Sequence, residues 1–176
     1  MTTSTIAQAV ADSLKQWGIV YNVALVGPTT RDKWECDQWR VTLEKDGKVE
    51  TFDYYTGKGL RAPATAQQKE MVRRGFPGLT DNDLKGKTGY GKRYLAAVES
   101  LRSPVAPDAA GVIYSLTLDA SATEQSFSDW CTEYGYDDDS MKAFRLYTDC
   151  CNTGKQLHRL FSEWQLNVLR ELLQDY

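Results

Sequence analysis

Histidine is almost absent from this chain: its 176 residues include only His158. An enzyme that uses a cysteine nucleophile needs a base beside the thiol, and zinc sites draw on paired Cys and His ligands. The four cysteines, Cys36, Cys131, Cys150 and Cys151, form no C-x-x-C pair and show no zinc-type spacing. A cysteine-dependent hydrolase or transferase, with Cys131 or Cys150 beside His158, is therefore only a third alternative. We expect no metal and no cofactor.

Long apolar runs and export signals are also missing. Nowhere do about 18 apolar residues follow one another, and the stretch Met1–Ala11 has no cationic start. The chain has no N-x-[S/T] sequon. Adjacent Cys150 and Cys151 cannot bond each other without a strained backbone. We therefore expect a soluble protein with reduced thiols, in a cytosol and without a membrane partner.

Charge is laid out unevenly along the chain. Residues 1–56 hold six Lys and Arg against eight Asp and Glu, residues 57–102 hold ten against four, and residues 103–176 hold five against twelve. The ten central cations, called here the basic belt, are Lys58, Arg61, Lys69, Arg73, Arg74, Lys85, Lys87, Lys92, Arg93 and Arg102. Clustered charge of one sign usually marks a surface that meets nucleic acid or an acidic protein.

The first part, residues 1–56, predicts a helix followed by a small antiparallel sheet. Apolar residues recur at helical spacing: Ile6, Val10, Leu14 and Trp17. Tyr21, Val23 and Leu25 then alternate before Gly27-Pro28, which predicts a strand that ends in a turn there. The dipeptide Asp46-Gly47 predicts a hairpin with a two-residue type I′ turn. Counting back from this turn pairs Leu43 with Glu50, Val41 with Phe52 and Trp39 with Tyr54 on the buried face, and Arg40 with Asp53 on the solvent face.

The middle part, residues 57–107, reads as a loop-rich basic excursion. It contains seven of the thirteen glycines and four of the five prolines. Two short helices are predicted in it, at Ala66–Arg74 and Lys92–Leu101. Gly86-Lys87-Thr88 is similar to the end of a phosphate-binding loop, but Asp81 stands where that motif needs a glycine.

Helices dominate the prediction for residues 108–176. Val112–Leu118 could alternate as a strand, but the apolar spacing favours a helix. Helix starts are predicted at Ser126, Ser140 and Ser162, the last with Gln165, and helix ends at Gly135 and Gly154. The acidic runs at Asp81 and at Asp137 break the ligand spacing of a calcium loop, so helix-start carboxylates are the better interpretation. The whole chain is predicted to be a single α+β domain with a three-stranded antiparallel meander and a helical C-terminal half.

The basic belt is the one feature that indicates a function. Its densest points interleave cations with tyrosines, and the predicted contact residues are Arg73, Arg74, Lys85, Lys87, Tyr90, Lys92, Arg93 and Tyr94. Such a mixture could neutralise phosphates and stack on bases, or dock on an acidic protein. It could equally stay solvated or pair with the acidic C-terminal third, in the same chain or in a second copy that forms a homodimer.

Two blocks carry a resemblance to a family. They are Trp34-Glu35-Cys36-Asp37-Gln38-Trp39 with the following Phe52–Gly57, and Tyr114–Asp119 with the following Phe127–Ala143. Both resemble a family of small uncharacterised proteins of tailed bacteriophages. The resemblance implies a phage protein that acts in the cytoplasm of its bacterial host, and it transfers no residue role.

These observations lead to a hypothesis about function. Small accessory phage proteins often disable host machinery, so we expect a non-catalytic protein that binds and inhibits a host protein or complex. A nucleic-acid-handling defence complex of the restriction or CRISPR type is the expected target. Direct binding of DNA or RNA is the alternative.

Overall fold

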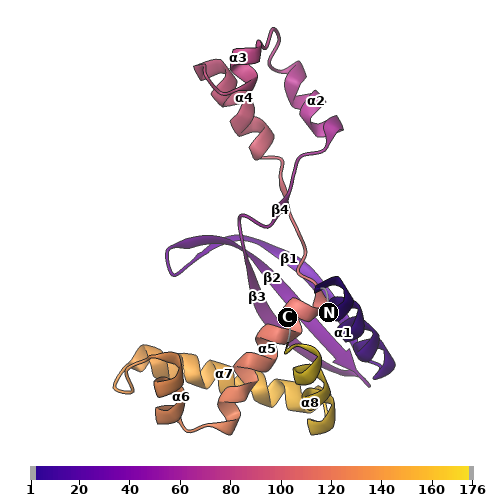
Figure 1. Cartoon of the computed structure of the whole chain (residues 1–176), viewed down its shortest axis with the longest axis vertical. Helices are drawn as coiled ribbons and strands as arrows, with labels where there is room; N and C mark the ends of the chain where they lie inside the picture. The colour runs from indigo at the N-terminus through magenta and orange to yellow at the C-terminus, as the bar shows by residue number, and fades with distance from the viewer. Residues whose placement is uncertain (1–2, 175–176) are drawn as a thin grey trace. The chain divides into compact units, whose positions relative to one another are not determined.

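The computed structural model describes residues 3–174 and has the predicted α+β class (Figure 1). Its helices are α1 (Thr3–Gln16), α2 (Ala66–Arg74), α3 (Asp81–Leu84), α4 (Gly89–Glu99), α5 (Ala109–Ala120), the 3₁₀ turn η1 (Ser121–Glu124), α6 (Phe127–Tyr134), α7 (Met141–Leu160) and α8 (Glu163–Leu172). Its strands are β1 (Val20–Arg31), β2 (Trp34–Lys45), β3 (Lys48–Gly57), β4 (Arg61–Ala62) and β5 (Ser103–Pro104). The first three strands form an antiparallel sheet in the order β1-β2-β3, which confirms the predicted meander.

The chain divides into two compact units. The first unit contains the chain up to Gly27, the segment Gln38–Tyr55 and the chain from Ala106 onward. The second unit contains Pro28–Asp37 and Thr56–Val105. The second unit therefore includes nearly all of the predicted excursion, together with a hairpin that precedes it.

The hairpin between β2 and β3 follows the prediction from Asp46-Gly47. Both turn residues have positive φ, 51° at Asp46 and 76° at Gly47, as a type I′ turn requires. Arg40 and Asp53 face each other across the strands, with Arg40 Nη2 3.8 Å from Asp53 Oδ1. Both side chains are exposed, so this pair marks the solvent face of the sheet.

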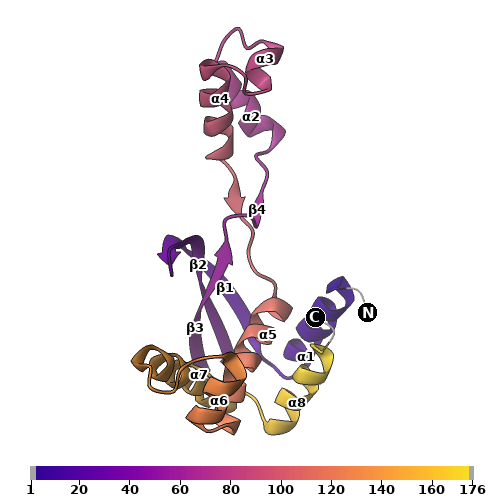
Figure 2. The same cartoon turned by 60° about the vertical axis from the view of Figure 1, so that its left-hand side comes forward.

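The core of the first unit lies on the opposite face of this sheet. Trp39, Val41 and Leu43 alternate along β2 and are buried. Helices α1, α5, α7 and α8 supply the rest of the core, and Figure 2 shows them gathered around the strands. The buried helical residues include Ile6, Val10, Leu14, Ile113, Leu157, Leu166 and Leu169. Among residues 3–174 no helix combines the length and apolar character that a membrane span needs.

A glutamate on the buried face of β3 has a charged partner from a helix. Glu50 is 8% exposed, and Arg159 of α7 donates a hydrogen bond from Nη1 to its Oε1 at 3.0 Å. A buried carboxylate is costly unless it is paired, so the guanidinium of Arg159 compensates for its burial. This pair links the sheet to α7.

The structure corrects the predicted end of the first strand. Gly27-Pro28 does not end it, because β1 continues to Arg31 and the chain reverses at Asp32-Lys33. These two residues have positive φ, 49° and 71°, so the turn has the left-handed geometry of a type I′ hairpin without a glycine. Gly27 has a φ of 144°, so it marks a local irregularity inside the strand.

Gly154 does not end its helix, contrary to the prediction, because α7 runs on to Leu160. Gly154 is buried against η1 and the end of α5. A Cβ at this position would lie 2.5 Å from Thr123 Cγ2 and 3.2 Å from the carbonyl oxygen of Ala120. Only glycine permits so close an approach of two elements. The glycine that resembled a stop signal is therefore a packing residue.

The other start and stop signals in the helical half are confirmed. The hydroxyls of Ser126, Ser140 and Ser162 cap α6, α7 and α8, and Gln165 completes a capping box with Ser162. Gly135 ends α6 with a φ of 69°. Val112–Leu118 lies inside α5, so the helical interpretation was correct.

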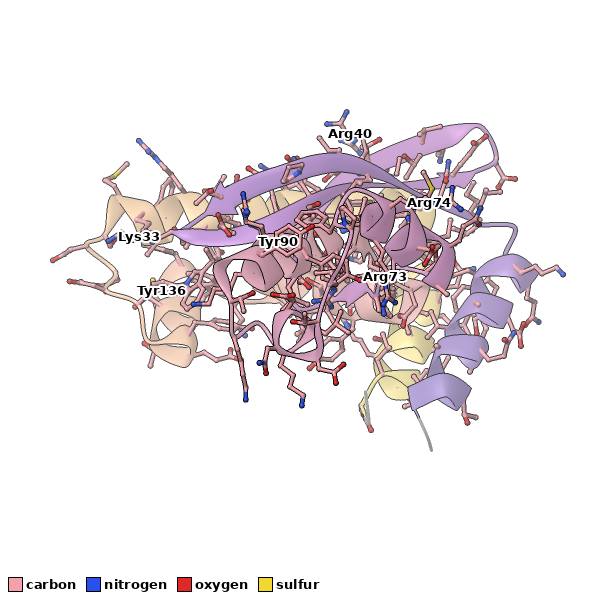
Figure 3. All side chains as sticks on the ribbon, turned by 90° about the horizontal axis from the view of Figure 1, so that it is seen from above. Lys33, Arg40, Arg73, Arg74, Tyr90 and Tyr136 are labelled. Carbon is pink, nitrogen blue, oxygen red and sulfur yellow. The ribbon has the colours of Figure 1, made fainter. Side chains whose placement is uncertain are left out.

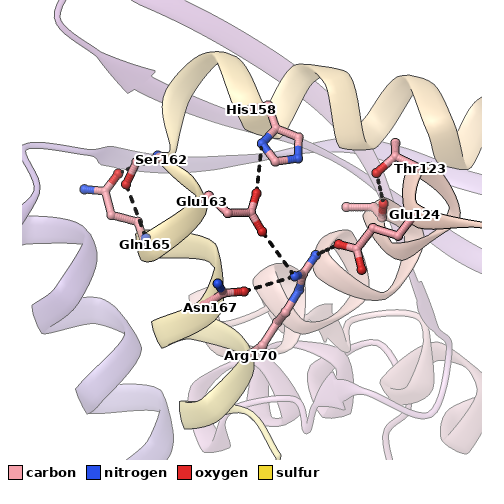
Figure 4. A network of polar contacts seen from close by, with 9 residues as sticks. Thr123, Glu124, His158, Ser162, Glu163, Gln165, Asn167 and Arg170 are labelled. Carbon is pink, nitrogen blue, oxygen red and sulfur yellow. Dashed lines mark hydrogen bonds and ion pairs between the residues drawn. The ribbon is translucent and has the colours of Figure 1, made fainter.

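A small ionic network holds α8 against η1 and the end of α7 (Figure 4). Arg170 pairs with Glu124 at 2.6 Å and lies 3.8 Å from Glu163, whose other oxygen is 3.8 Å from His158 Nδ1. Asn167 accepts a further hydrogen bond from Arg170 at 3.2 Å. Part of the acidic charge of the C-terminal third is thus neutralised locally.

Candidate interaction surface

The helical part of the second unit, Thr65–Arg102, is called here the basic module. Each of its three helices begins at a threonine whose hydroxyl accepts a hydrogen bond from the third helical residue: Thr65 for α2, Thr80 for α3 and Thr88 for α4. Such caps satisfy backbone donors that a helix start would otherwise leave without partners. The sequence therefore encodes each helix start locally.

A buried carboxylate locks α3 to the start of α4. Asp83 is 6% exposed and accepts hydrogen bonds from Thr80 N at 2.8 Å, from Thr80 Oγ1 at 2.7 Å and from Thr88 Oγ1. These donors, Thr88 first, lower the pKa of Asp83 below its ordinary value. Gly91 packs directly on this residue, and a Cβ there would lie 2.1 Å from the Asp83 carbonyl oxygen.

This lock also settles the role of Gly86-Lys87-Thr88. The Thr88 hydroxyl donates to Asp83 and accepts from Gly91 N at 2.9 Å, so it serves the fold of the module. Gly86 has a φ of 67° and makes the turn between α3 and α4. The segment connects α3 to α4. Lys85 and Lys87 lie on either side of Gly86 in this ordered turn.

The aromatic residues of the module point into its small core. Phe76 contacts Tyr90 and Tyr94, with ring centroids 5.4 and 5.7 Å apart. Tyr94 is 7% exposed, so it is a core residue and not the contact residue that the sequence predicted. Tyr90 is half-buried and donates a hydrogen bond to the Pro77 carbonyl at 2.9 Å. Neither ring is free to stack on a base.

The other six predicted contact residues are cations, and all six are exposed, as is Lys69, a further cation of the basic belt. Lys69, Arg73 and Arg74 lie on α2, Lys85 and Lys87 lie on the α3–α4 turn, and Lys92 and Arg93 lie on α4. Within residues 3–174 none of these seven side chains forms an ion pair with a carboxylate. Arg93 lies over the Tyr90 ring, 5.7 Å from its centroid. Figure 3 labels Arg73 and Arg74 on α2 and Tyr90 on α4.

The other three belt cations are neutralised. Lys58 pairs with Glu35, and Arg102 pairs with Glu99 at 2.8 Å. Arg61 pairs with the buried Asp37 at 2.7 Å. The structure thus divides the predicted belt into paired cations next to the strands and unpaired cations on α2, on α4 and on the turn between α3 and α4.

The two chain segments that enter and leave the module are joined to each other. In β4 and β5, Arg61 pairs with Pro104 and Ala62 with Ser103 in antiparallel register. Arg102 Nη2 donates to the Arg61 carbonyl at 2.8 Å, and Val105 N donates to the Leu60 carbonyl at 3.0 Å. The module is therefore closed at its base as a single inserted element.

Exposed apolar side chains accompany the free cations. Met71 on α2 is 66% exposed, and Leu84 on α3 and Leu95 on α4 are each 39% exposed. The basic module therefore exposes both cations and apolar side chains.

Two cysteines, Cys131 and Cys150, lack the environment of a nucleophile. Burial raises the pKa of Cys131, and burial with the nearby Asp119 carboxylate raises the pKa of Cys150 to about 12. The neutral thiol therefore prevails at neutral pH, and it is the poor nucleophile. His158 stands two helical turns beyond Cys150 on α7 and contacts Glu163 instead. Among residues 3–174 no hydrogen bond joins a cysteine to this histidine.

One group of carboxylates lies close together outside the module. Oxygens of Asp137, Asp138 and Asp139 lie within 4.8 Å of one another, and all three side chains are exposed. The predicted helix-start role of Asp81 and Asp83 is confirmed by their place in the first turn of α3. The aspartates at 137–139 instead precede the α7 cap, Ser140.

Two exposed features were not predicted from the sequence. Trp34 begins β2 beside the Asp32-Lys33 turn and is 77% exposed. Tyr136 stacks on Trp130 with ring centroids 5.1 Å apart and an interplanar angle of 1°. The pattern Tyr134-Gly135-Tyr136 after a helix was the available signal for the second feature, since a left-handed glycine redirects the chain back over the helix.

Comparisons with known proteins found no match, neither among protein-family models nor among curated proteins or solved structures. The resemblance to tailed-phage proteins therefore stays a prediction.

Proposed function

We propose that this chain is a non-catalytic binding protein whose basic module docks on an acidic surface of a partner protein. The observation that carries the proposal is the set of seven exposed cations that no carboxylate of residues 3–174 neutralises. Their side chains extend from a module whose helices are capped and locked, so the backbone needs little further ordering on binding. Opposite charge on a partner would raise the association rate and fix the orientation.

A protein partner is preferred over nucleic acid for a structural reason. Tyr94 is buried and Tyr90 is covered by Phe76 and Arg93, so the aromatic platforms that single strands need are occupied. Met71, Leu84 and Leu95 are exposed instead. Binding of a duplex through its phosphates needs cations alone and is the second candidate.

The inhibitor hypothesis gives this proposal its biological setting. On that hypothesis the partner is a bacterial host protein, in particular a defence complex that handles nucleic acid, and docking of the module blocks it. Proteins that handle nucleic acid usually have basic binding faces, so the module would engage an acidic face elsewhere on such a complex. The phage origin and the inhibition stay predictions.

The test is capture from a nuclease-treated bacterial lysate on immobilised protein. The module variant reverses four charges: Arg73→Glu, Arg74→Glu, Lys92→Glu and Arg93→Glu. The control variant reverses four exposed charges of the first unit, Lys15→Glu, Lys48→Glu, Arg145→Glu and Lys155→Glu, so that both variants have the same net charge. The proposal expects proteins that the wild type and the control retain and the module variant loses.

Two results would count against this proposal. Equal retention by all three proteins would show that the module is not the docking surface. A gel shift of a DNA duplex that disappears in the module variant and weakens steeply with salt would favour the nucleic-acid candidate, provided that the wild type captures proteins from an untreated lysate and not from the nuclease-treated one.

A further inference from the structure

A second exposed surface, of opposite charge, lies between α6 and α7. We name residues Tyr134–Met141 the acidic-aromatic loop. Its three aspartates, Asp137, Asp138 and Asp139, are exposed and close together, and no ion pair neutralises them within residues 3–174. Three like charges at such distances repel one another, so a cationic partner would relieve the repulsion.

The aromatic side chains of this loop provide an independent observation. Trp130 is 5% exposed and covers one face of Tyr136 in the parallel stack, whereas Tyr136 itself is 43% exposed. Part of the Tyr136 side chain therefore meets solvent outside this stack. Tyr134 is 44% exposed and also contacts Trp130, with centroids 5.2 Å apart. Both tyrosines are fixed by a buried indole.

Together these groups match the chemistry of arginine. A guanidinium can stack on an aromatic face while its N–H groups donate to a neighbouring carboxylate, and Arg does both better than Lys. The exposed part of Tyr136 and the carboxylates that follow it offer both interactions within one short loop. The loop is suited to a protein segment with adjacent arginines.

We propose that the acidic-aromatic loop of one molecule binds the basic module of a second copy of this chain. A second copy is the chosen partner because its basic module has the charge opposite to that of the loop. The module displays seven unpaired cations, including the adjacent pair Arg73 and Arg74 on α2. The inference rests on the proposed function in one respect, because it uses the same module as a docking surface. Each molecule would offer one module and one loop, so two copies can form a two-fold dimer with two module–loop contacts, and the dimer fraction rises with concentration.

The first experiment measures mass against concentration by sedimentation equilibrium, with the full chain of 19.9 kDa. The loop variant carries Asp137→Asn, Asp138→Asn and Asp139→Asn. The control variant neutralises three exposed carboxylates elsewhere, through Glu44→Gln, Asp149→Asn and Glu171→Gln. We expect the wild type to associate at about 0.05 M salt and to dissociate at about 0.5 M, because screening weakens exposed charge pairs. The loop variant should raise the dissociation constant about tenfold or more, and the control should change it about twofold at most.

The second experiment tests the pairing of the two surfaces by complementation. The module variant of the capture experiment is mixed with the neutral loop variant, Asp137→Asn, Asp138→Asn and Asp139→Asn. Each should be monomeric alone, since each lacks one surface. In an equimolar mixture the wild-type loop of the module variant can bind only the wild-type module of the loop variant, so a one-to-one complex is expected. Circular dichroism confirms that each variant is folded.

Three outcomes would overturn the inference: a wild type that is monomeric at every concentration, association that neither variant weakens, or a mixture that stays monomeric. Its failure is separable from failure of the proposed function. A monomeric wild type that still captures proteins through its module removes only the second-copy contact. If association depends on both surfaces but capture of other proteins does not depend on the module, only the proposed acidic partner protein is ruled out.

Discussion

Arg61 donates two hydrogen bonds to Asp37, from Nη2 to Oδ1 at 2.7 Å and from Nε to Oδ2 at 3.2 Å. The Asp37 side chain is 1% exposed, so this guanidinium is the partner that its burial requires. The seven outer cations of the module have no such carboxylate within residues 3–174. The contrast separates cations that serve the fold from cations that remain for a partner.

Removal of Arg61 should therefore destabilise the protein, although its charge belongs to the basic belt. Arg61→Met leaves the Asp37 carboxylate buried without its partner, and we expect the melting temperature to fall by about 5 °C or more. Arg40→Met is the matched control, because the Arg40–Asp53 pair is exposed on both sides and should matter little. Thermal unfolding followed by circular dichroism checks both. Equal melting temperatures for Arg61→Met and wild type would contradict the proposed role of this pair.

Two glycines at the start of α4 should respond in opposite ways to alanine. At Gly91 a Cβ would lie 2.1 Å from the Asp83 carbonyl oxygen, whereas at Gly89 no atom lies within 4 Å. Gly91→Ala should cost about 3 kcal/mol or more, because backbone must move, and should expose the aromatic core of the module. Gly89→Ala should be neutral or should stabilise by up to about 1 kcal/mol. Urea unfolding of both variants measures the difference, and a tolerated Gly91→Ala would show that α3 and α4 do not pack as described.

The packing of Gly154 in α7 can be tested by a destabilising substitution and a second substitution that compensates for it. Alanine usually stabilises a helix interior, but Gly154→Ala should cost about 1–3 kcal/mol because its Cβ would meet Thr123 Cγ2. Thr123→Ser removes that methyl group and keeps the hydroxyl that donates to the Ala120 carbonyl at 2.8 Å. The double variant should regain much of the loss in urea unfolding. Strict additivity of the two substitutions would mean that they do not share this contact.

Stability should fall in alkaline solution partly through Cys150. Burial, with Asp119 nearby, raises the pKa of this thiol from 9.0 to about 12. Between these values the unfolded chain releases the thiol proton while the native state retains it, so the native state binds more protons and loses stability as pH rises. Cys150→Ala should therefore show a shallower loss between pH 9 and about 12 when unfolding is measured across that window. If the stability of the variant and of the wild type fell in parallel with pH, the raised pKa of Cys150 would be refuted.

Local signals in the sequence predicted much of the fold. The Asp46-Gly47 turn and the caps at Ser126 and Ser162 depend on neighbours within three residues, so a sequence contains all that defines them. Gly27 and Gly154 were misinterpreted because their roles depend on strand irregularity and on contact with Ala120 and Thr123. The same residue type ends helices, bends strands and admits close packing, and only tertiary structure distinguishes these roles.

The sequence predicted which residues carry the positive charge of the candidate surface. It did not predict which of these cations are paired with carboxylates. Arg61 and Asp37 stand 24 residues apart, so their pairing required the fold. The burial of Tyr94 could have been inferred, because Tyr90 and Tyr94 recur at helical spacing and Gly91 lies between them on the same face. The exposed face of α4 then falls at Lys92 and Arg93, as observed.

The central claim is that the outer cations of the module are unpaired and accessible. Labelling with an arginine-selective dicarbonyl reagent, read residue by residue by mass spectrometry on dilute protein at high salt, tests it most directly. We predict that Arg73, Arg74 and Arg93 react several times faster than Arg61, whose guanidinium is held by Asp37. Protection of Arg73, Arg74 and Arg93 to the level of Arg61 would show that the chain's own carboxylates already neutralise them, and would contradict the proposed docking surface.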